Sequence, residues 1–371
     1  MIRVLHIVNI MNRGGLETMI MNLYRNIDRT KVQFDFLTHN TQPGDYDDEI
    51  KELGGNIYNV ASRRQGFLNN RKQLIEFFKH HPEYMIVHMH VSSLSYITPL
   101  KMATKARVPI RIIHSHSTSI GKNKLHVLLH RFNQRNLTKY ATNYFACSDL
   151  AAKWLYGNDL YSKLDISLVN NSIDARKFIF NKKVRERIRE EFNISDKFVI
   201  GHVGRFQKPK NHNFLINIFK EIHNINPNVV LMLVGRGELE KQIKNKVRNL
   251  ELSNDVIFMG VRSDIPELLQ AMDVFLFPSL HEGLPVTLVE AQAAGLRIIA
   301  SDSITEEICL TNLVKFLSLK QPASEWAKEV LNYIDGYERK DTFDEISNAG
   351  YDMKTLARNL KQFYINMSVE N

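Results

Sequence analysis

Short apolar runs alternate along the chain with longer segments whose apolar positions recur every three or four residues. In the first half, the apolar runs that predict β-strands lie at 3–10, 33–40, 56–61, 84–90, 110–117 and 143–148. The segments that predict helices between them lie at 15–27, 70–80, 95–106 and 124–141. Regular alternation of strand and helix is typical of βαβ units and therefore predicts a parallel sheet.

The alternation stops over 170–195, where the chain is first irregular and then highly charged, and we place the linker between two domains there. It restarts with strands predicted at 198–205, 229–237, 255–260, 274–279, 297–301 and 314–319. Helices are predicted at 211–223, 238–250 and 264–272, and a last amphipathic helix covers 353–367. The pattern predicts an N-terminal domain over 1–175, a C-terminal domain over 176–350, and a C-terminal helix, 351–371, that packs back on the N-terminal domain.

The composition is typical of a soluble globular protein, with 371 residues, 44% of them hydrophobic and 24% charged. No apolar run reaches the roughly 18 residues that a membrane-spanning helix needs. The N-terminal apolar run is too short for a secretory signal and lacks a small-residue cleavage site. Cys147 and Cys309 lie far apart without metal-ligand spacing, which favours a reducing cytoplasm over a structural zinc site.

The positive charge is concentrated in one stretch. The whole chain carries +9, whereas 60–140 holds fourteen Lys or Arg residues against two acids, a net charge of +12. Such a block indicates an anionic partner, such as phosphate groups or a membrane surface, and a solvated basic face is the alternative. No helix-turn-helix, RRM, KH or zinc-finger pattern is present, so nucleic acid is not the expected partner.

Ligands bind beyond the carboxyl ends of parallel strands, so the residues just after each strand are the candidates for chemistry. Gly14 and Gly15 follow the first strand, where paired glycines let a ligand approach and the next helix offers free N–H groups to an anion. A plain tight turn is the alternative. The three-glycine fingerprint of NAD enzymes is incomplete here, so a nicotinamide cofactor is poorly supported.

Two cations and two acids stand at corresponding places in the second half. Arg205 closes a predicted strand and Lys210 follows at the mouth of the next helix, a pair suited to a diphosphate. Glu282 lies in the turn before a helix expected to start at Pro285, and Glu290 lies about a turn and a half inside that apolar helix. A buried carboxylate needs partners, and sugar hydroxyls would supply them. The alternatives are exposed loop cations, a capping acid and an exposed helix acid.

Three motifs together resemble a known family. GGLET after the first strand, GRFQKPK around Arg205 and Lys210, and the E-x7-E spacing in HEGLPVTLVEAQAAG are similar to the retaining GT-B glycosyltransferases of family 4 and to their bacterial capsule and exopolysaccharide branch. The segment LVNNSID…F resembles the family's interdomain segment, with Ser172 where glycine is usual. The resemblance implies an α/β fold of two Rossmann-like, doubly wound parallel-sheet domains that face each other across a cleft.

The resemblance also implies a nucleotide-diphosphate sugar as donor, UDP-sugar favoured, bound mainly by the C-terminal domain. Arg205 and Lys210 would neutralise the diphosphate, and Glu290 would accept hydrogen bonds from the ribose hydroxyls. Glu282, with the backbone N–H groups near Gly283 and Leu284, would hold the hydroxyls of the donor sugar.

Other implied contacts come from both halves of the chain. Gly14 and Gly15 would close over the phosphates, and Val261 would contact the base. His116, or less readily His114, would face the sugar, because residues two apart on a strand point the same way and the sequence does not separate them. A structural histidine is the alternative for either one.

The implied reaction moves a hexose or N-acetylhexosamine with retention of configuration to a lipid-linked or glycan acceptor. It needs no cofactor and no metal, since Asp45 and Asp47 form a D-x-D pattern that the start of a charged helix explains more simply. The acceptor and the basic stretch together predict a cytoplasmic protein, peripheral at the inner face of the cell membrane. A nucleotide-sugar epimerase and a non-catalytic sugar-nucleotide-binding protein are the alternatives. The sequence does not identify the sugar, base, acceptor, linkage or oligomeric state.

Overall fold

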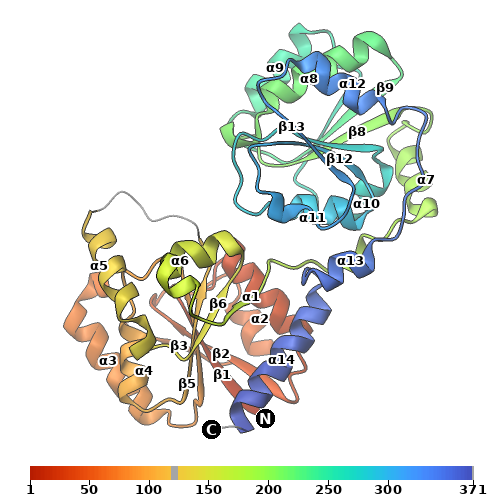
Figure 1. Ribbon diagram of the computed structural model, residues 1–371. Coiled ribbons are helices and arrows are strands. Elements are labelled where there is room, and N and C mark those ends of the chain that lie inside the picture. Colours follow the sequence, from red (N-terminus) through yellow and green to blue (C-terminus); the bar gives the residue numbers. More distant parts are fainter. Residues whose placement is uncertain (118–123, 370–371) are drawn as a thin grey trace. The chain divides into compact units, whose positions relative to one another are not determined.

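The chain folds into two compact units, each built on one parallel sheet with helices on both faces. The computed structural model describes residues 1–117 and 124–369 (Figure 1). The first unit contains Met1–Ser172 and the C-terminal helix, and the second contains Ile173–Asp352. The α/β architecture with two parallel-sheet domains, predicted from the alternation of strands and helices, is confirmed.

The first sheet has seven strands in the order β3-β2-β1-β4-β5-β6-β7, and every neighbouring pair is parallel. The strands are β1 (Ile2–Val8), β2 (Val32–Thr38), β3 (Ile57–Asn59), β4 (Ile86–Val91), β5 (Ile110–Ser115), β6 (Asn143–Ala146) and β7 (Ile166–Leu168). The strand order reverses between β1 and β4. The loops after these two strands therefore border the crevice where ligands bind in sheets of this kind.

Two helical layers cover this sheet. The helices are α1 (Gly15–Asn26), α2 (Asp47–Glu52), α3 (Phe67–His80), α4 (Thr98–Lys105), α5 (Lys124–Arg135), α6 (Asp149–Tyr161) and α14 (Met353–Val369), with short 3-10 helices η1 (Arg63–Gln65) and η2 (Leu137–Lys139). Helix α14 lies against α1, β1 and β2 (Figure 1). Its Tyr364 is fully buried, packs on Phe34 and hydrogen-bonds His88. The last helix of the chain therefore completes the core of the unit that the first half forms.

The second sheet has six strands, all parallel, in the order β10-β9-β8-β11-β12-β13. The strands are β8 (Phe198–Val203), β9 (Val229–Val234), β10 (Val256–Gly260), β11 (Val274–Phe277), β12 (Arg297–Ser301) and β13 (Val314–Leu317). The helices are α7 (Lys182–Glu191), α8 (His212–Ile225), α9 (Glu240–Asn249), α10 (Ile265–Ala271), α11 (Val286–Ala293), α12 (Ala323–Leu331) and α13 (Phe343–Asn348), with 3-10 helices η3 (Ala175–Lys177), η4 (Lys208–Lys210) and η5 (Glu306–Ile308). The order of this sheet reverses between β8 and β11.

The charged stretch that the sequence places in the linker forms α7 and belongs to the second unit. Asp273, just before β11, pairs with Arg185 at 2.5 Å and with Arg189 at 3.1 Å, and it also accepts a hydrogen bond from the Val199 N–H. Two arginines four positions apart share one face of a helix, so both reach the same carboxylate. The high charge of this stretch thus serves packing within the unit. Elements β7, α6, α7, α12 and α13 are not among those predicted.

Among the described residues, no helix combines the length and the apolar character that a membrane span requires.

Candidate functional site

The loops after β8 and β11 meet at the switch point of the second sheet. The Leu280 N–H donates to the Pro209 carbonyl at 2.7 Å, and the Asn211 side-chain amide donates to the Pro278 carbonyl at 3.1 Å. Beneath them, His202 Nδ1 lies 2.9 Å from the Leu276 carbonyl, so Nδ1 carries the proton and donates across from β8 to β11. These bonds fix the two loops that carry Lys210 and Glu282.

Lys210 and Glu282 form an ion pair, with Nζ 2.8 Å from Oε1. Both side chains are mostly buried, at 18% and 13% exposure, so their attraction is less screened than that of a surface pair. The Lys210 ammonium also lies 4.6 Å from the centre of the Phe277 ring. The two atoms of the pair are close but not aligned as a hydrogen bond, so the Glu282 oxygen keeps unused acceptor capacity. The structure thus joins the predicted phosphate-binding cation and the predicted sugar-binding acid in one pair.

Arg205 stands in the same loop as Lys210, is exposed, and forms no ion pair within the described residues. The backbone around it is tightly packed. A Cβ at Gly204 would lie 2.8 Å from His202 Nε2, and a Cβ at Gly235, which has φ +138°, would collide with the Gly204 carbonyl oxygen. The loop after β9, VGRG, is therefore part of the same edge of the sheet. This loop is not among the sites predicted from the sequence, although its two glycines after a strand gave the signal.

Glu290 lies in α11 with no hydrogen bond or ion pair from its carboxylate in the part of the chain described. Burial raises the pKa of Glu290 to about 7. A partly buried acid without a partner is costly, and donors on a ligand would relieve that cost. Helix α11 starts at Val286, one residue later than expected, because Pro285 is extended and caps it.

Two hydroxyl groups near Glu282 and Glu290 are not among the residues predicted from the sequence. Ser279 Oγ and Thr287 Oγ1 are buried and have no hydrogen-bond partner among the described residues. Serine and threonine are common near helix starts, so the sequence gave no signal that separates these two from ordinary capping residues. In the same loop, Gly283 has open space where a side chain would stand, while Leu284 packs partly against the core.

Val261 follows β10 and is 74% exposed. Strand β9 separates β10 from β8, so the sheet places Val261 two strands away from the switch point. A ligand reaching from Lys210 to Val261 would have to cross the loop after β9.

The predicted glycines of the first unit lie at the carboxyl end of β1. Gly14 caps α1, and Gly15 begins it, with no atom within 4 Å of the place where a Cβ would stand. Nearby, the Asp45 carboxylate accepts from the Arg13 N–H at 3.0 Å, and the Asp47 carboxylate accepts from the Gly44 N–H at 2.9 Å. Both acids of the D-x-D pattern therefore hold backbone N–H groups.

Five histidines form a ladder on one face of the first sheet. His6 of β1 lies opposite His88 of β4, and His90 of β4 lies opposite His114 of β5. His90 bridges two of them, with its Nε2 2.9 Å from His6 Nδ1 and its Nδ1 2.9 Å from His116 Nε2. His114 is 1% exposed and lies 3.1 Å from His88, inside the sheet. His116 follows β5 at the carboxyl edge and is partly exposed, so the fold separates the two histidines that the sequence could not.

The ladder determines which nitrogen of His116 carries the proton. His6 Nε2 is buried and has no partner in the part of the chain that the structure describes, and an unpartnered lone pair is tolerated better than an unpartnered N–H. We therefore assign the proton of His6 to Nδ1, which donates to His90, and His90 Nδ1–H in turn donates to His116 Nε2. His116 then carries its proton on Nδ1 and is a donor. Burial lowers the pKa of His116 to about 3, so the ring is neutral near pH 7.

Two groups within the ladder have nitrogen atoms within 4.8 Å of one another, as metal ligands require: His6, His88 and His90, and His90, His114 and His116. Hydrogen bonds between the rings already occupy most of these nitrogens. In the first group the His90 ring stacks on the rings of His6 and His88, whereas the three rings of the second group are tilted against one another. The arrangement fits a hydrogen-bonded ladder better than a metal centre.

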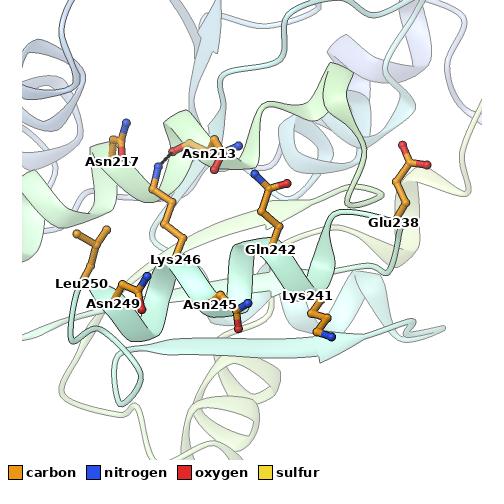
Figure 2. Close-up of a pocket in the computed structure, with 9 residues that line it drawn as sticks. All are labelled: Asn213, Asn217, Glu238, Lys241, Gln242, Asn245, Lys246, Asn249 and Leu250. Carbon is orange, nitrogen blue, oxygen red and sulfur yellow. Dashed lines mark hydrogen bonds between the residues drawn. The ribbon is translucent and has the colours of Figure 1, made fainter.

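A hollow of about 700 Å³ lies on the outside of the second unit, between α8 and α9. Figure 2 shows its polar lining, in which Lys246 reaches across to the Asn213 carbonyl at 2.8 Å. No residue predicted from the sequence lines it. Its amide and amine side chains belong to the solvent face of the helices, so it is not the candidate site.

Two family models together match most of the chain. The model of glycosyl transferases group 1 matches residues 184–348, and that of glycosyltransferase family 4 matches residues 13–177.

Several curated proteins are similar in sequence. EpsF of Bacillus subtilis (strain 168), which is assigned as a glycosyltransferase, is 38% identical over 381 residues, which covers 99% of this chain and 97% of that protein. The capsular polysaccharide biosynthesis glycosyltransferase CapH of Staphylococcus aureus is 24% identical over 377 residues, with full coverage of both chains at 100% and 100%. An Escherichia coli UDP-Gal:alpha-D-GlcNAc-diphosphoundecaprenol alpha-1,3-galactosyltransferase is 32% identical over 251 residues, which covers 65% of this chain and 64% of that enzyme.

Among solved structures, Anabaena Alr3699/HepE in complex with UDP superposes with a TM-score of 0.72 at 16% identity, over 100% of this chain and 98% of that one. At this identity the likeness concerns the fold alone. The architecture is the GT-B fold that the resemblance implied.

Proposed function

This chain belongs to the group 1 glycosyltransferases, and from that premise we propose that it transfers a hexose or N-acetylhexosamine from a UDP-sugar, with retention of configuration. The observation that carries the proposal is the Lys210–Glu282 pair at the switch point of the second sheet. A cation and an acid with free acceptor capacity, side by side at a crevice, suit a ligand that has both phosphates and hydroxyls. The UDP named for HepE and the UDP-Gal named for the E. coli relative support the choice of nucleotide.

Each part of the site has a proposed role. Lys210 and the unpaired Arg205 neutralise the diphosphate and the charge that grows on the leaving nucleotide. Glu282, with the backbone N–H groups near Gly283 and Leu284, positions the donor sugar. Glu290 accepts hydrogen bonds from the ribose hydroxyls, since its carboxylate has no partner among the residues that the structure describes.

Residues farther from the switch point complete the donor site in this proposal. Val261 contacts the base across the loop after β9. In the first unit, Gly15 offers its backbone N–H to the phosphates, and Gly14, whose own N–H donates to the Asn12 carbonyl at 2.8 Å, lets them approach the start of α1. His116 donates its Nδ1–H to a hydroxyl of the sugar. The ladder beneath His116 keeps that donor in place.

The proposed chemistry is a front-face displacement without a covalent intermediate. The acceptor hydroxyl attacks the anomeric carbon as the diphosphate leaves, and its proton passes to the departing phosphate oxygen. Glu282 binds the sugar and is not the nucleophile in this proposal, because its carboxylate is paired with the Lys210 ammonium group. Arg205 and Lys210 supply the positive charge, so the reaction requires no metal.

We further propose a lipid-linked or glycan acceptor in capsule or exopolysaccharide synthesis. The diphosphoundecaprenol in the name of the E. coli relative and the capsular polysaccharide in that of CapH support this. The +12 charge of 60–140 would draw the protein from the cytoplasm to an anionic membrane surface at the inner face of the cell membrane.

A screen of nucleotide sugars by thermal unfolding tests the proposal. A ligand present at a hundred times its dissociation constant should add about 2.7 kcal/mol to the free energy of unfolding. The best UDP-sugar is then incubated with lipid-diphosphate acceptors, and the anomeric configuration of the product is determined by NMR. A product of inverted configuration would refute retention, release of epimerised free sugar would favour an epimerase, and binding without turnover of any acceptor would favour a non-catalytic role.

A further inference from the structure

Helix α5 turns apolar residues toward solvent and polar residues toward the protein. Leu128 and Phe132 are 65% and 60% exposed, whereas His130 and Asn133 are buried. The buried pair is anchored to one residue, Leu94: its N–H donates to His130 Nδ1 at 3.1 Å, and its carbonyl accepts from the Asn133 amide at 2.7 Å. Hydrogen bonds therefore fix the rotation of the helix that exposes its apolar face.

Helix α3 adds apolar surface of the same kind. Of the fourteen large apolar side chains that are exposed among the described residues, six lie on α3 or α5: Phe67, Leu68, Ile75, Leu125, Leu128 and Phe132. Single exposed apolar residues are normal on a protein surface. A concentration on two helices marks a surface that contacts another apolar body.

Residues of α3, α4 and α5 line a groove of about 670 Å³. Its apolar lining includes Phe67, Leu129 and Phe132. Its charged lining is Arg63, Arg71, Lys101 and Lys105, and no acidic residue lines it. The volume is that of a site for a small molecule or for part of a larger one.

None of the four cations of the groove pairs with a carboxylate in the described part of the chain. Arg63 donates to the Ser95 carbonyl at 3.1 Å, and Lys101 donates to the Asn133 side-chain oxygen at 3.1 Å. Burial lowers the pKa of Lys101, as expected for an ammonium group held away from water without an anion. The groove therefore lacks negative charge.

We propose that this groove binds a lipid whose head group carries phosphate. The cations would take the phosphate, the apolar lining would take the first part of the chain, and Leu128 and Phe132 would enter the bilayer around it. An inorganic anion would leave the apolar surface exposed, and a neutral lipid would leave the cations unpaired. Only an anionic amphiphile satisfies both sets of residues.

One end of the groove lies at the carboxyl edge of the first sheet, where the proposed acceptor would bind. Helices α4 and α5 follow β4 and β5, and Arg63 follows β3, so this end of the groove lies at the carboxyl edge of the sheet. Gly14, Gly15 and His116 lie at the same edge. The inference deepens the proposed function, on which it rests, by assigning a place for the lipid of a lipid-linked acceptor.

Co-sedimentation of the full-length protein with lipid vesicles tests the assignment. The probes are vesicles of phosphatidylcholine alone and of phosphatidylcholine with phosphatidylglycerol, at low and high salt. One double variant removes apolar contact, Leu128→Ser with Phe132→Ser, and a second removes charge, Arg71→Gln with Lys105→Gln. A matched control, Lys31→Gln with Lys163→Gln, removes the same charge from exposed positions of the same unit outside the groove.

We expect the phosphatidylglycerol vesicles to bind the wild-type protein and each groove variant to bind about tenfold more weakly or worse. The control should change binding by no more than about twofold. The apolar variant should bind more weakly than the wild-type protein at high salt as well as at low salt, because salt does not screen the apolar contact that this variant removes. Equal binding by groove and control variants, or no binding to vesicles, would overturn the proposal. Displacement of the vesicles by inorganic phosphate at constant ionic strength would make the groove a plain anion site and would also overturn it.

Stabilisation by UDP is measured on the same variants. The groove lies in the first unit, whereas the proposed nucleotide residues lie mainly in the second, so the groove variants should keep the wild-type shift in unfolding temperature. If no nucleotide sugar stabilises the protein, the proposed function fails while the vesicle result still decides the lipid groove. If UDP binds and the groove variants behave as the control does, only the lipid groove fails.

Discussion

Replacing Glu290 by glutamine should stabilise the second unit, and the gain should depend on pH. Burial raises the pKa of Glu290 from 4.5 to about 7 in the folded protein. Between these two pH values the folded state holds a proton that the unfolded state has released, so the wild-type protein loses stability as the pH rises. At about 1.4 kcal/mol per pH unit, the loss approaches roughly 3 kcal/mol above pH 7.

Glutamine has nearly the same shape as glutamate and does not ionise. The free energy of unfolding of Glu290→Gln should therefore not fall with rising pH in this way. The variant and the wild-type protein should differ little at pH 4.5 and below. Above pH 7 the variant should be more stable by up to roughly 3 kcal/mol. The sign follows from the raised pKa of Glu290, because ionising this partly buried acid costs energy in the folded state alone.

Denaturant unfolding from pH 4.5 to pH 8 measures the difference. Trp326 is buried in α12 of the second unit, so its fluorescence reports on that unit in a Trp154→Phe background. Glu190→Gln, at an exposed position of α7 in the same unit, serves as the matched control. A Glu290→Gln difference that is constant across this pH range, or one that destabilises the protein at pH 8, would refute the reasoning.

Three further predictions concern the site and the fold. Glu282→Ala should mainly lower kcat, whereas Glu290→Ala should mainly raise the Kd for UDP in titration calorimetry; equal losses in both parameters for both variants would contradict the division of roles. His116→Ala should lower kcat by a factor that is constant from pH 5.5 to pH 8, since the ring, with a pKa of about 3, does not titrate there, and a loss that grows toward low pH in the rate profile would count against it. Asp273→Ala should destabilise the second unit by about 3 kcal/mol or more, because it leaves two partly buried arginines unpaired, and Trp326 fluorescence in denaturant should show it.

The choice between metal-dependent and metal-independent transfer is open to a direct test. Treatment with EDTA should leave the transfer rate unchanged, since Arg205 and Lys210 supply the charge that stabilises the leaving diphosphate. Loss of activity that returns with added Mn²⁺ or Mg²⁺ would show that this reasoning is wrong.

The sequence by itself determined the local structure and most of the candidate residues. Hydrophobic periodicity depends only on neighbouring positions, so it predicted most strands and helices of both parallel sheets. Arg205, Lys210, Glu282 and Glu290 could be selected because each stands at a strand-to-helix junction or just inside the following helix. Their proposed roles came from the family resemblance and not from periodicity.

The tertiary structure alone decided which of these residues meet and which faces are buried. Pairing of β8 with β11 brings Lys210 to Glu282, and strand order depends on packing between segments far apart in the chain. The same packing buries His114 and leaves His116 at the edge, although the two are equivalent in the strand pattern. Helix α5 shows most clearly what periodicity cannot predict. The pattern predicted an amphipathic helix, yet the apolar face of α5 points toward solvent. Its polar face is buried and is held there by hydrogen bonds to Leu94. Burial is a property of neighbours in space, which the spacing of residues along one helix does not contain.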